Sequence, residues 1–178
     1  MTVDLATRPG PSEHADYQTP YIAAVPDGDI RETLAAAGES AQRLYAAISE
    51  PRSHFAYSPG KWTIREVVAH VADSERVFAY RALRFGRADS TPLPGFDQEI
   101  WVPHSRASTR PWEEIIADFA AVRAATLSLV RSFSGEDWER GGKASGIAVT
   151  VRALTWVIAG HELHHRRILL ERYGVGVA

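Results

Sequence analysis

The sequence predicts an all-α fold, an antiparallel four-helix bundle with a long link between its second and third helices. Three observations carry this prediction. Apolar residues recur at steps of three and four over four long segments, which is the pattern of a helix with one buried face. Capping residues or a proline precede each of these segments. No segment shows the clear apolar–polar alternation that is typical of a strand.

The composition limits the class of protein. The chain has 178 residues, which is enough for one domain with a sizeable core. Its net charge of −2, with acidic and basic residues interspersed, gives no support for a nucleic-acid partner. No apolar run approaches the ~20 residues of a membrane span, and no signal peptide precedes the fold. We therefore expect a cytoplasmic protein with no membrane partner.

The first expected element is a lead-in rather than a helix. Residues 1–27 are rich in Pro, Thr, Asp and Ala and lack periodicity, so we expect an extended or partly disordered segment. The four-helix-bundle domain, which we also expect to bind metal, is predicted over residues 28–178. Its first helix is predicted over residues 30–48, because Asp29 and Glu32 fit the two positions of a capping box.

The second helix is predicted over residues 64–85, where Thr63 and Glu66 fit a second capping box. Residues 86–110 follow as a long loop, because the prolines within this stretch exclude a continuous helix. Long loops inside compact domains are often functional. The sequence therefore places a candidate functional loop between the second and third helices.

The third and fourth helices complete the predicted bundle. Pro111 suits the start of a helix over residues 112–133, and Thr150 suits the cap of a helix over residues 150–173. Residues 138–149 contain three glycines but lack the preceding strand and the Gly-Lys-Ser/Thr ending of a phosphate-binding loop, so we expect a plain glycine loop. The shorter connections predict that the first and second helices, and the third and fourth, are antiparallel neighbours.

Three of the seven histidines lie on or beside the inward faces of the predicted helices. His161 and His165 are four residues apart, so a helix presents their side chains on one face, one turn apart. His70 lies beside the apolar stripe of the second helix. Three others fall in predicted loops, where we expect solvated side chains outside any site: His14, His54 and His104.

His70, His161 and His165 are candidate ligands of one divalent metal ion. The chain contains no cysteine, so any metal site has to use His, Asp or Glu. Three imidazoles plus water match an open, catalytic type of site, where the ion lowers the pKa of a bound water or substrate thiol. The alternative is three core histidines paired with carboxylates or backbone groups. Glu66 and Asp73, one turn to either side of His70, are candidate supporting carboxylates, and a solvated helix face explains them equally well.

The same segment also satisfies His-Glu-x-x-His, the signature of zinc proteases, in which Glu162 would be the general base. The context argues against proteolysis. Only 13 residues follow His165, and none of them supplies the third ligand that such proteases take from downstream.

Four stretches of the chain closely resemble the YfiT-type branch of the DinB-like family. They are Tyr57-Ser-Pro-Gly-Lys-Trp62 with the residues up to His70, Asp73-Ser-Glu75, Leu93-Pro-Gly-Phe-Asp-Gln-Glu99, and Ala159-Gly-His-Glu-Leu-His-His165. The resemblance extends over nearly the whole chain from about Tyr17. It implies a four-helix bundle, often homodimeric, with one metal ion, nickel or zinc in most members. The implied ligands are His70, His161 and His165, with open positions for water, whereas Glu162 and His164 are not ligands.

The resemblance implies a metal-dependent enzyme with a small-molecule substrate. Some members join a low-molecular-weight thiol, such as bacillithiol or mycothiol, to an electrophile, so the first hypothesis is a metal-dependent thiol transferase. The second is a metal-dependent hydrolase that uses metal-bound hydroxide, and the third is a non-enzymatic dimeric metal-binding bundle. No catalytic residue is assigned beyond the metal-bound water or thiolate. Four acidic residues have no assigned role: Asp73, Glu75, Asp97 and Glu99.

Overall fold

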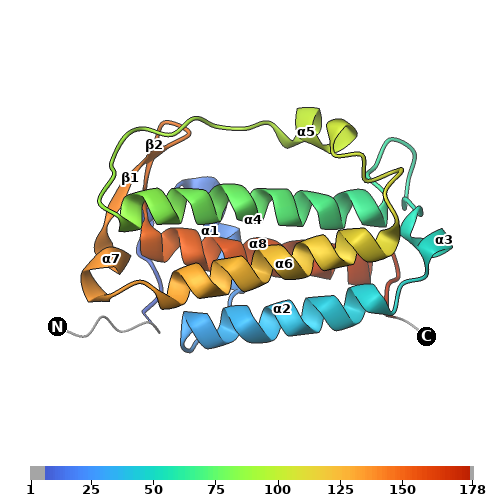
Figure 1. Ribbon diagram of the computed structural model, residues 1–178, viewed down its shortest axis with the longest axis horizontal. Coiled ribbons are helices and arrows are strands. Elements are labelled where there is room, and N and C mark those ends of the chain that lie inside the picture. The colour runs from blue at the N-terminus through green and yellow to red at the C-terminus, as the bar shows by residue number, and fades with distance from the viewer. Residues whose placement is uncertain (1–6, 177–178) are drawn as a thin grey trace.

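Four long helices lie side by side and form the body of the molecule in the computed structural model, which describes residues 7–176 (Figure 1). They are α2 (Ile30–Ala46), α4 (Ile64–Gly86), α6 (Trp112–Arg131) and α8 (Val151–Glu171). All four predicted helices are present, and the predicted four-helix bundle is confirmed. None of the described helices is long and apolar enough to cross a membrane.

The order of the helices around the bundle is α2, α6, α4, α8, so α4 packs against both α6 and α8. The prediction that α2 and α4 are neighbours, and that α6 and α8 are neighbours, is wrong, because each of these pairs lies diagonally across the bundle. The connection over residues 47–63 contains a short helix, α3 (Glu50–Ser53), and is long enough to cross the diagonal. The long link returns the chain to the end where α4 began, so α4 and α6 run in the same direction (Figure 1).

Side-chain caps fix the starts of three of these helices. Asp29 accepts a backbone hydrogen bond in the first turn of α2. Thr63 and Glu66 form the predicted capping box of α4, in which the Thr63 amide donates to the Glu66 carboxylate over 2.7 Å. Thr150 accepts a backbone hydrogen bond at the start of α8. Helix α6 differs in detail, because Pro111 is its N-cap residue rather than part of its first turn.

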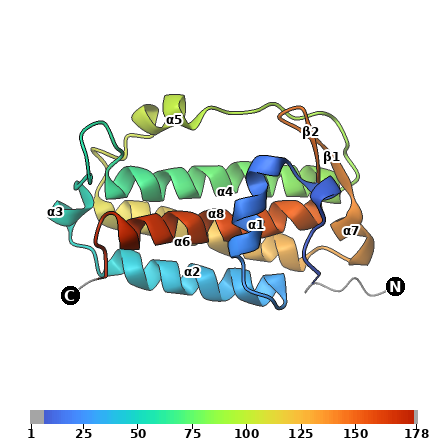
Figure 2. The same ribbon diagram turned by 180° about the vertical axis from the view of Figure 1, so that it is seen from behind.

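The segment before the bundle is helical in part. Over residues 7–27 the predicted extended lead-in contains two 3-10 turns, η1 (Pro11–Glu13) and η2 (Asp16–Gln18), and the helix α1 (Thr19–Ala24), which crosses α8 (Figure 2). Ile22 is buried against the bundle. A Cβ on residue 160 would lie 2.0 Å from the Tyr21 carbonyl oxygen, so Gly160 is what allows this crossing. Six residues are too few for a helical periodicity to be visible in the sequence.

Two predicted loops also contain regular structure. The link over residues 86–110 includes α5 (Gln98–His104). The predicted glycine loop contains the end of α7 (Gly135–Glu139) and an antiparallel hairpin, β1 (Gly141–Ala144) with β2 (Ile147–Thr150). Strands of only four residues, the first of which contains two glycines, give no alternation long enough to predict. Leu93 of the link bridges to Ala144, so the link and the hairpin meet at one end of the bundle (Figure 1).

Buried apolar side chains form two clusters, one toward each end of the bundle. One cluster includes the apolar residues of α8 between Val151 and Ala159, and the other includes Leu169 of the same helix. Between them, the middle of α8 carries His161 and His165. A polar layer therefore separates the two apolar clusters, and the candidate site lies in this layer.

Candidate metal centre

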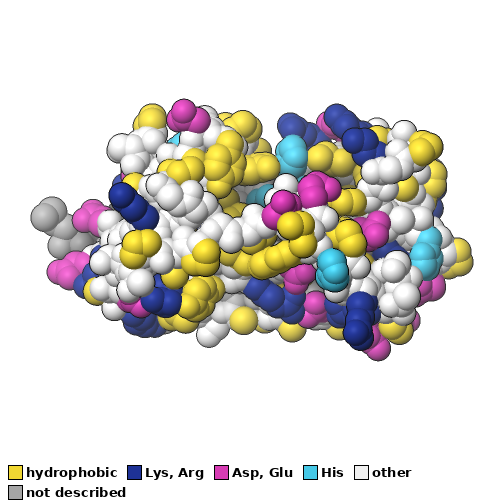
Figure 3. Space-filling model, turned by 90° about the horizontal axis from the view of Figure 1, so that it is seen from above, with side chains coloured by type: hydrophobic (Ala, Val, Ile, Leu, Met, Phe, Trp, Pro, Cys, Tyr) yellow, Lys and Arg dark blue, Asp and Glu magenta, His cyan; other side chains and the backbone are white. Residues whose placement is uncertain are grey.

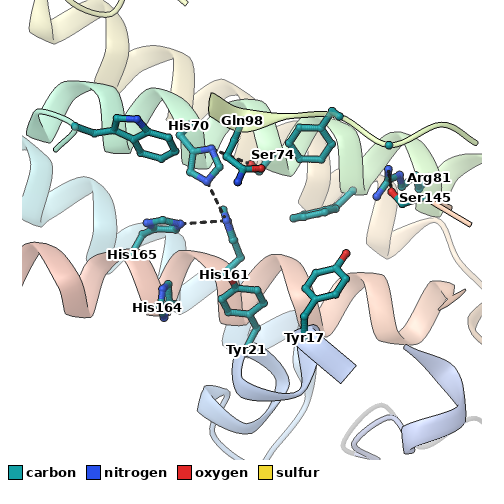
Figure 4. Close-up of a pocket in the computed structure, with 14 residues that line it drawn as sticks. Tyr17, Tyr21, His70, Ser74, Arg81, Gln98, Ser145, His161, His164 and His165 are labelled. Atoms are coloured by element: carbon teal, nitrogen blue, oxygen red, sulfur yellow. Dashed lines mark hydrogen bonds between the residues drawn. The ribbon is translucent and has the colours of Figure 1, made fainter. Parts of the chain in front are cut away.

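The structure brings together the three histidines that the sequence singles out. His70 projects from α4, and His161 and His165 project from α8, which packs against it (Figure 4). The Nε2 atom of His161 lies 3.2 Å from the Nε2 atom of His70 and 3.2 Å from that of His165. One ring nitrogen from each residue lies within 4.8 Å of the other two, which is close enough for one ion to contact all three.

Burial keeps these imidazoles neutral. It lowers the pKa of His70 to about 4, and burial together with the neighbouring histidines lowers the pKa of His165 to about 3. The pKa of His161 is also well below its usual value, first through burial and then through the other histidines. A metal takes the unprotonated nitrogen of a neutral imidazole, so the cluster is in the ligand form at neutral pH.

The hydrogen bonds around the cluster fit a metal ion. The Nδ1 atom of His70 lies 3.4 Å from the Ser74 hydroxyl, which can accept a hydrogen bond from Nδ1 when the lone pair is on Nε2. The Nδ1 atom of His165 is buried and has no hydrogen-bond partner. The close Nε2 contacts are hydrogen bonds in the absence of an ion, and a cation among the three Nε2 atoms would replace them by contacts to three lone pairs. The donor set is the three-imidazole type that zinc, nickel, copper and iron all accept.

The histidines form part of the wall of a cavity of about 480 Å³. Figure 3 shows histidine side chains in a hollow bordered by hydrophobic side chains, on the face that carries the long link. Aromatic rings surround the cluster, and the Trp62 ring lies 4.9 Å from the His70 ring. The cavity is lined by Tyr17, Tyr21, Trp62, His70, Ser74, Phe78, Arg81, Gly95, Phe96, Gln98, Ser145, His161, His164 and His165.

The carboxylates that the sequence offered as neighbours of His70 lie elsewhere. Glu66 is occupied in the cap of α4. Asp73 forms an ion pair with Arg76 over 3.1 Å and does not line the cavity. Among the residues left without a role, Glu75 binds the buried Arg123. The remaining two acidic residues lie at α5, where Asp97 caps the helix and Glu99 is exposed.

The remaining predicted loop histidines also lie outside the cluster. His54 and His104 are exposed, as expected, although His104 belongs to α5 rather than to a loop. The expectation that His14 is solvated is wrong, because it is buried and its Nδ1 atom lies 2.9 Å from the Ala15 carbonyl oxygen. His14 lies in the segment before α1, where the sequence has no periodicity from which burial could be predicted.

Glu162 does not line the cavity. Its carboxylate is fully buried, and one oxygen lies 3.4 Å from the Arg166 Nε atom. Burial raises its pKa to about 7, against the opposing effect of Arg166 and Arg123. The general base of a zinc protease has to reach the reacting centre. The geometry therefore agrees with the sequence argument against proteolysis.

Several residues that line the cavity were not predicted from the sequence. Arg81 follows His70 by eleven residues, which is close to three helical turns, so the same face of α4 carries both. That spacing is a usable signal in the sequence. Tyr17 and Tyr21 come from the segment expected to be unstructured, and Ser145 comes from the turn of an unpredicted hairpin. No local pattern marks these three.

Comparison with known proteins decides the family. A family model described as the DinB superfamily matches residues 33–169. This chain belongs to the DinB superfamily. The match spans α4, α6 and nearly all of α8, so it includes His70, His161 and His165.

Individual relatives agree with the DinB superfamily assignment. A protein of Geobacillus thermodenitrificans named "Putative metal-dependent hydrolase" is 25% identical over 146 residues, which cover 77% of this chain and 80% of that protein. A protein of Oceanobacillus iheyensis named "Putative metal-dependent hydrolase OB0413" is 31% identical over 116 residues, which cover 61% of this chain and 63% of that protein. The solved structure of YfiT from Bacillus subtilis, described as "a probable metal-dependent hydrolase with an unusual four-helix bundle topology", superposes with a TM-score of 0.67 at 19% identity, over 97% of this chain and 99% of YfiT. At this identity the YfiT likeness shows the shared fold.

Proposed function

We propose that this protein is a metal-dependent hydrolase whose one divalent ion is held by His70, His161 and His165. The observation that carries the proposal is the convergence of three neutral imidazole nitrogens on the wall of an open cavity. The names of the Geobacillus and Oceanobacillus relatives support the same class of reaction. An ion with three imidazole ligands keeps a position open for water and supplies a Lewis acid that lowers the pKa of that water.

The other cavity residues have roles that follow from their chemistry. Ser74 orients the His70 ring through its Nδ1 atom. Trp62 and Phe78 exclude water and bind an apolar part of the substrate. Burial, followed by the nearby Tyr17, raises the pKa of Tyr21, so its hydroxyl keeps its proton and donates hydrogen bonds at neutral pH.

Metal analysis and turnover test this proposal together. Protein purified without a His-tag or added metal is expected to carry close to one divalent ion per chain, nickel or zinc, and to hydrolyse members of a panel of activated esters and amides. The His161→Ala variant is expected to lose both the ion and the turnover. His104→Ala is the matched control, because His104 is an exposed histidine outside the cavity. A metal-loaded protein with no turnover on the panel, or full turnover in His161→Ala, would contradict hydrolysis at this site.

A second candidate is transfer of a low-molecular-weight thiol to an electrophile. The chain has no cysteine, so the thiol would have to enter from outside. The cavity of about 480 Å³ is far larger than the ~30 Å³ of a water molecule and has room for two reactants. Metal-dependent conjugation of bacillithiol, mycothiol or glutathione to an aryl halide would favour transfer. Protein that carries no ion, together with a His70→Ala variant that melts like the wild type, would favour the non-enzymatic bundle.

A further inference from the structure

We propose that the cavity accepts a substrate with a free carboxylate, and that Arg81 binds this carboxylate at the end of the cavity away from the three histidines. The inference rests on the proposed function only in taking this cavity as the substrate site. Figure 4 shows Arg81 and Ser145 together at one end, and the histidine cluster at the other. The protein would thus distinguish acidic substrates from neutral ones of the same length.

Arg81 is a buried cation without an anionic partner. Only 3% of its surface is exposed, yet it lines the cavity. Its Nη2 atom donates to the Pro94 carbonyl oxygen over 2.8 Å and to the Ser145 hydroxyl over 3.0 Å, and both of these acceptors are neutral. Within residues 7–176, no carboxylate lies within ion-pair distance of Arg81, and its Nε and Nη1 atoms have no hydrogen-bond partner.

The other deeply buried arginines show what is missing at Arg81. Arg65 and Arg123 are each 1% exposed, and each has a carboxylate partner, Glu50 and Glu75 respectively. Burying a charge without a partner is strongly unfavourable, which is why buried arginines are normally paired. Burial also lowers the pKa of Arg81. A ligand carboxylate at this position would supply the counter-charge that the chain supplies to the other two.

The charge of the site favours a carboxylate over a phosphate. Among the described residues that line this cavity, Arg81 is the only Lys or Arg, so at the end away from the three histidines the side chains supply a single positive charge. A carboxylate carries one negative charge and matches it, whereas a phosphate monoester carries nearly two at neutral pH. Ser145 adds a neutral hydroxyl, held in the hairpin turn with a left-handed φ of 55°. A guanidinium binds a carboxylate through charge-assisted hydrogen bonds, and the hydroxyl can donate one more.

The position of Arg81 also sets the length of the substrate. Arg81 and His70 lie three turns apart on one face of α4, so their Cα atoms are separated by roughly 16 Å along the helix axis. Both side chains lean toward the N-terminus of the helix, and the longer Arg81 side chain reaches farther in that direction, which brings the guanidinium somewhat nearer to the His70 ring. The Phe78 and Phe96 rings line the cavity with them, and the Arg81 guanidinium carbon lies 5.9 Å from the centre of the Phe96 ring. The substrate is therefore an acid whose reacting bond is separated from the carboxylate by an apolar spacer on the order of 10 Å.

Binding to metal-free protein tests the site without any turnover. Monomethyl suberate carries one carboxylate on an apolar chain, and dimethyl suberate is its neutral counterpart. Calorimetric titration is expected to show at least tenfold tighter binding of the monoacid, and Arg81→Gln is expected to abolish that preference. The metal is removed because a carboxylate also binds metal ions. Arg76→Gln is the matched control, since Arg76 lies on α4 outside this cavity.

Equal binding of the two esters by the wild type overturns the proposal, as does a preference that survives in Arg81→Gln. If Arg81→Gln does not fold, Arg81→Met takes its place, because it removes the charge and keeps an unbranched apolar side chain. A lost preference in Arg81→Met then supports the site, and an unchanged preference overturns it. A second experiment uses metal-loaded protein and 4-nitrophenyl half-esters. If the protein binds the acidic esters more tightly but does not hydrolyse them, the carboxylate site is supported and the hydrolase proposal is contradicted. If it hydrolyses acidic and neutral esters equally well, the hydrolase proposal is supported and the carboxylate site is contradicted.

Discussion

Glu75 and Arg123 form an ion pair in which both side chains are almost completely buried, and two parallel hydrogen bonds of 2.9 Å join them. Arg123 also donates to the Leu34 carbonyl oxygen, so a single side chain of α6 ties α4 to α2. The pair lies in the polar layer of the bundle, beside the buried Glu162, whose charge acts on Arg123. Removing one partner would leave the other charged and desolvated.

Arg123→Met is therefore expected to lower the free energy of unfolding by roughly 3–5 kcal/mol, since Glu75 would lose its partner. The double variant Glu75→Gln with Arg123→Met is expected to recover part of that loss. Urea denaturation of the four proteins in the cycle measures the coupling. Glu39→Gln is the control, because the Glu39–Arg43 pair is exposed and 3.8 Å long and should contribute at most ~0.5 kcal/mol. Strictly additive effects would contradict the coupling.

The buried histidines predict a pH dependence for the metal-free protein. The pKa of His70 falls from 6.5 to about 4 on folding. As the pH falls from 6.5 toward 4, the unfolded chain takes up protons that the folded chain does not, so the free energy of unfolding decreases. For His70 alone the loss would reach roughly 3 kcal/mol near pH 4. Urea midpoints between pH 7 and pH 5 are expected to fall less steeply in His70→Gln than in the wild type or in the His54→Gln control. Equal slopes in all three would contradict this.

Among the elements, α1 supplies one wall of the cavity through Tyr21. It packs across α8, and the backbone of Tyr21 sits directly over Gly160. Tyr21 also presents its ring to the His161 ring, with 5.5 Å between the ring centres. Gly160, which precedes His161, thus positions one wall of the cavity, although it lowers the intrinsic stability of the helix.

Gly160→Ala is a sharp test of this contact. Alanine favours a helix over glycine by ~1 kcal/mol, but its Cβ would lie 2.0 Å from the Tyr21 carbonyl oxygen. We expect a net loss of stability of about 1–3 kcal/mol, as for other overpacked sites, and weaker metal binding because α1 has to move. Gly10→Ala is the control, since its nearest neighbouring atom lies at an ordinary 3.8 Å. A Gly160→Ala protein that is more stable than the wild type would show that α1 does not rest on α8 in this way.

For the molecule as a whole, the sequence predicts the elements better than their arrangement. Caps such as Thr63–Glu66 and the apolar stripes locate the four long helices, because both signals are local. Periodicity shows which face of a helix is buried but not which partner buries it, so the diagonal placement of α2 and α4 was not predictable. His161 and His165 could be paired from their spacing, whereas Tyr21 and Ser145 reach the cavity through tertiary contacts alone. The predicted homodimer stays a prediction, which sedimentation velocity would test.

One consequence of the cluster concerns the rates of folding and unfolding. His70 and His161 are 91 positions apart in the chain, so the cluster of three histidines is complete only after α4 has docked on α8. An ion that recognises only this late arrangement lowers the rate of unfolding and leaves the rate of folding unchanged. At a free zinc concentration of 100 times Kd, unfolding is expected to slow by ~100-fold. Stopped-flow measurements in urea with and without zinc would show a shift in the unfolding arm alone. The bound ion would then slow the unfolding of the folded bundle without directing its formation.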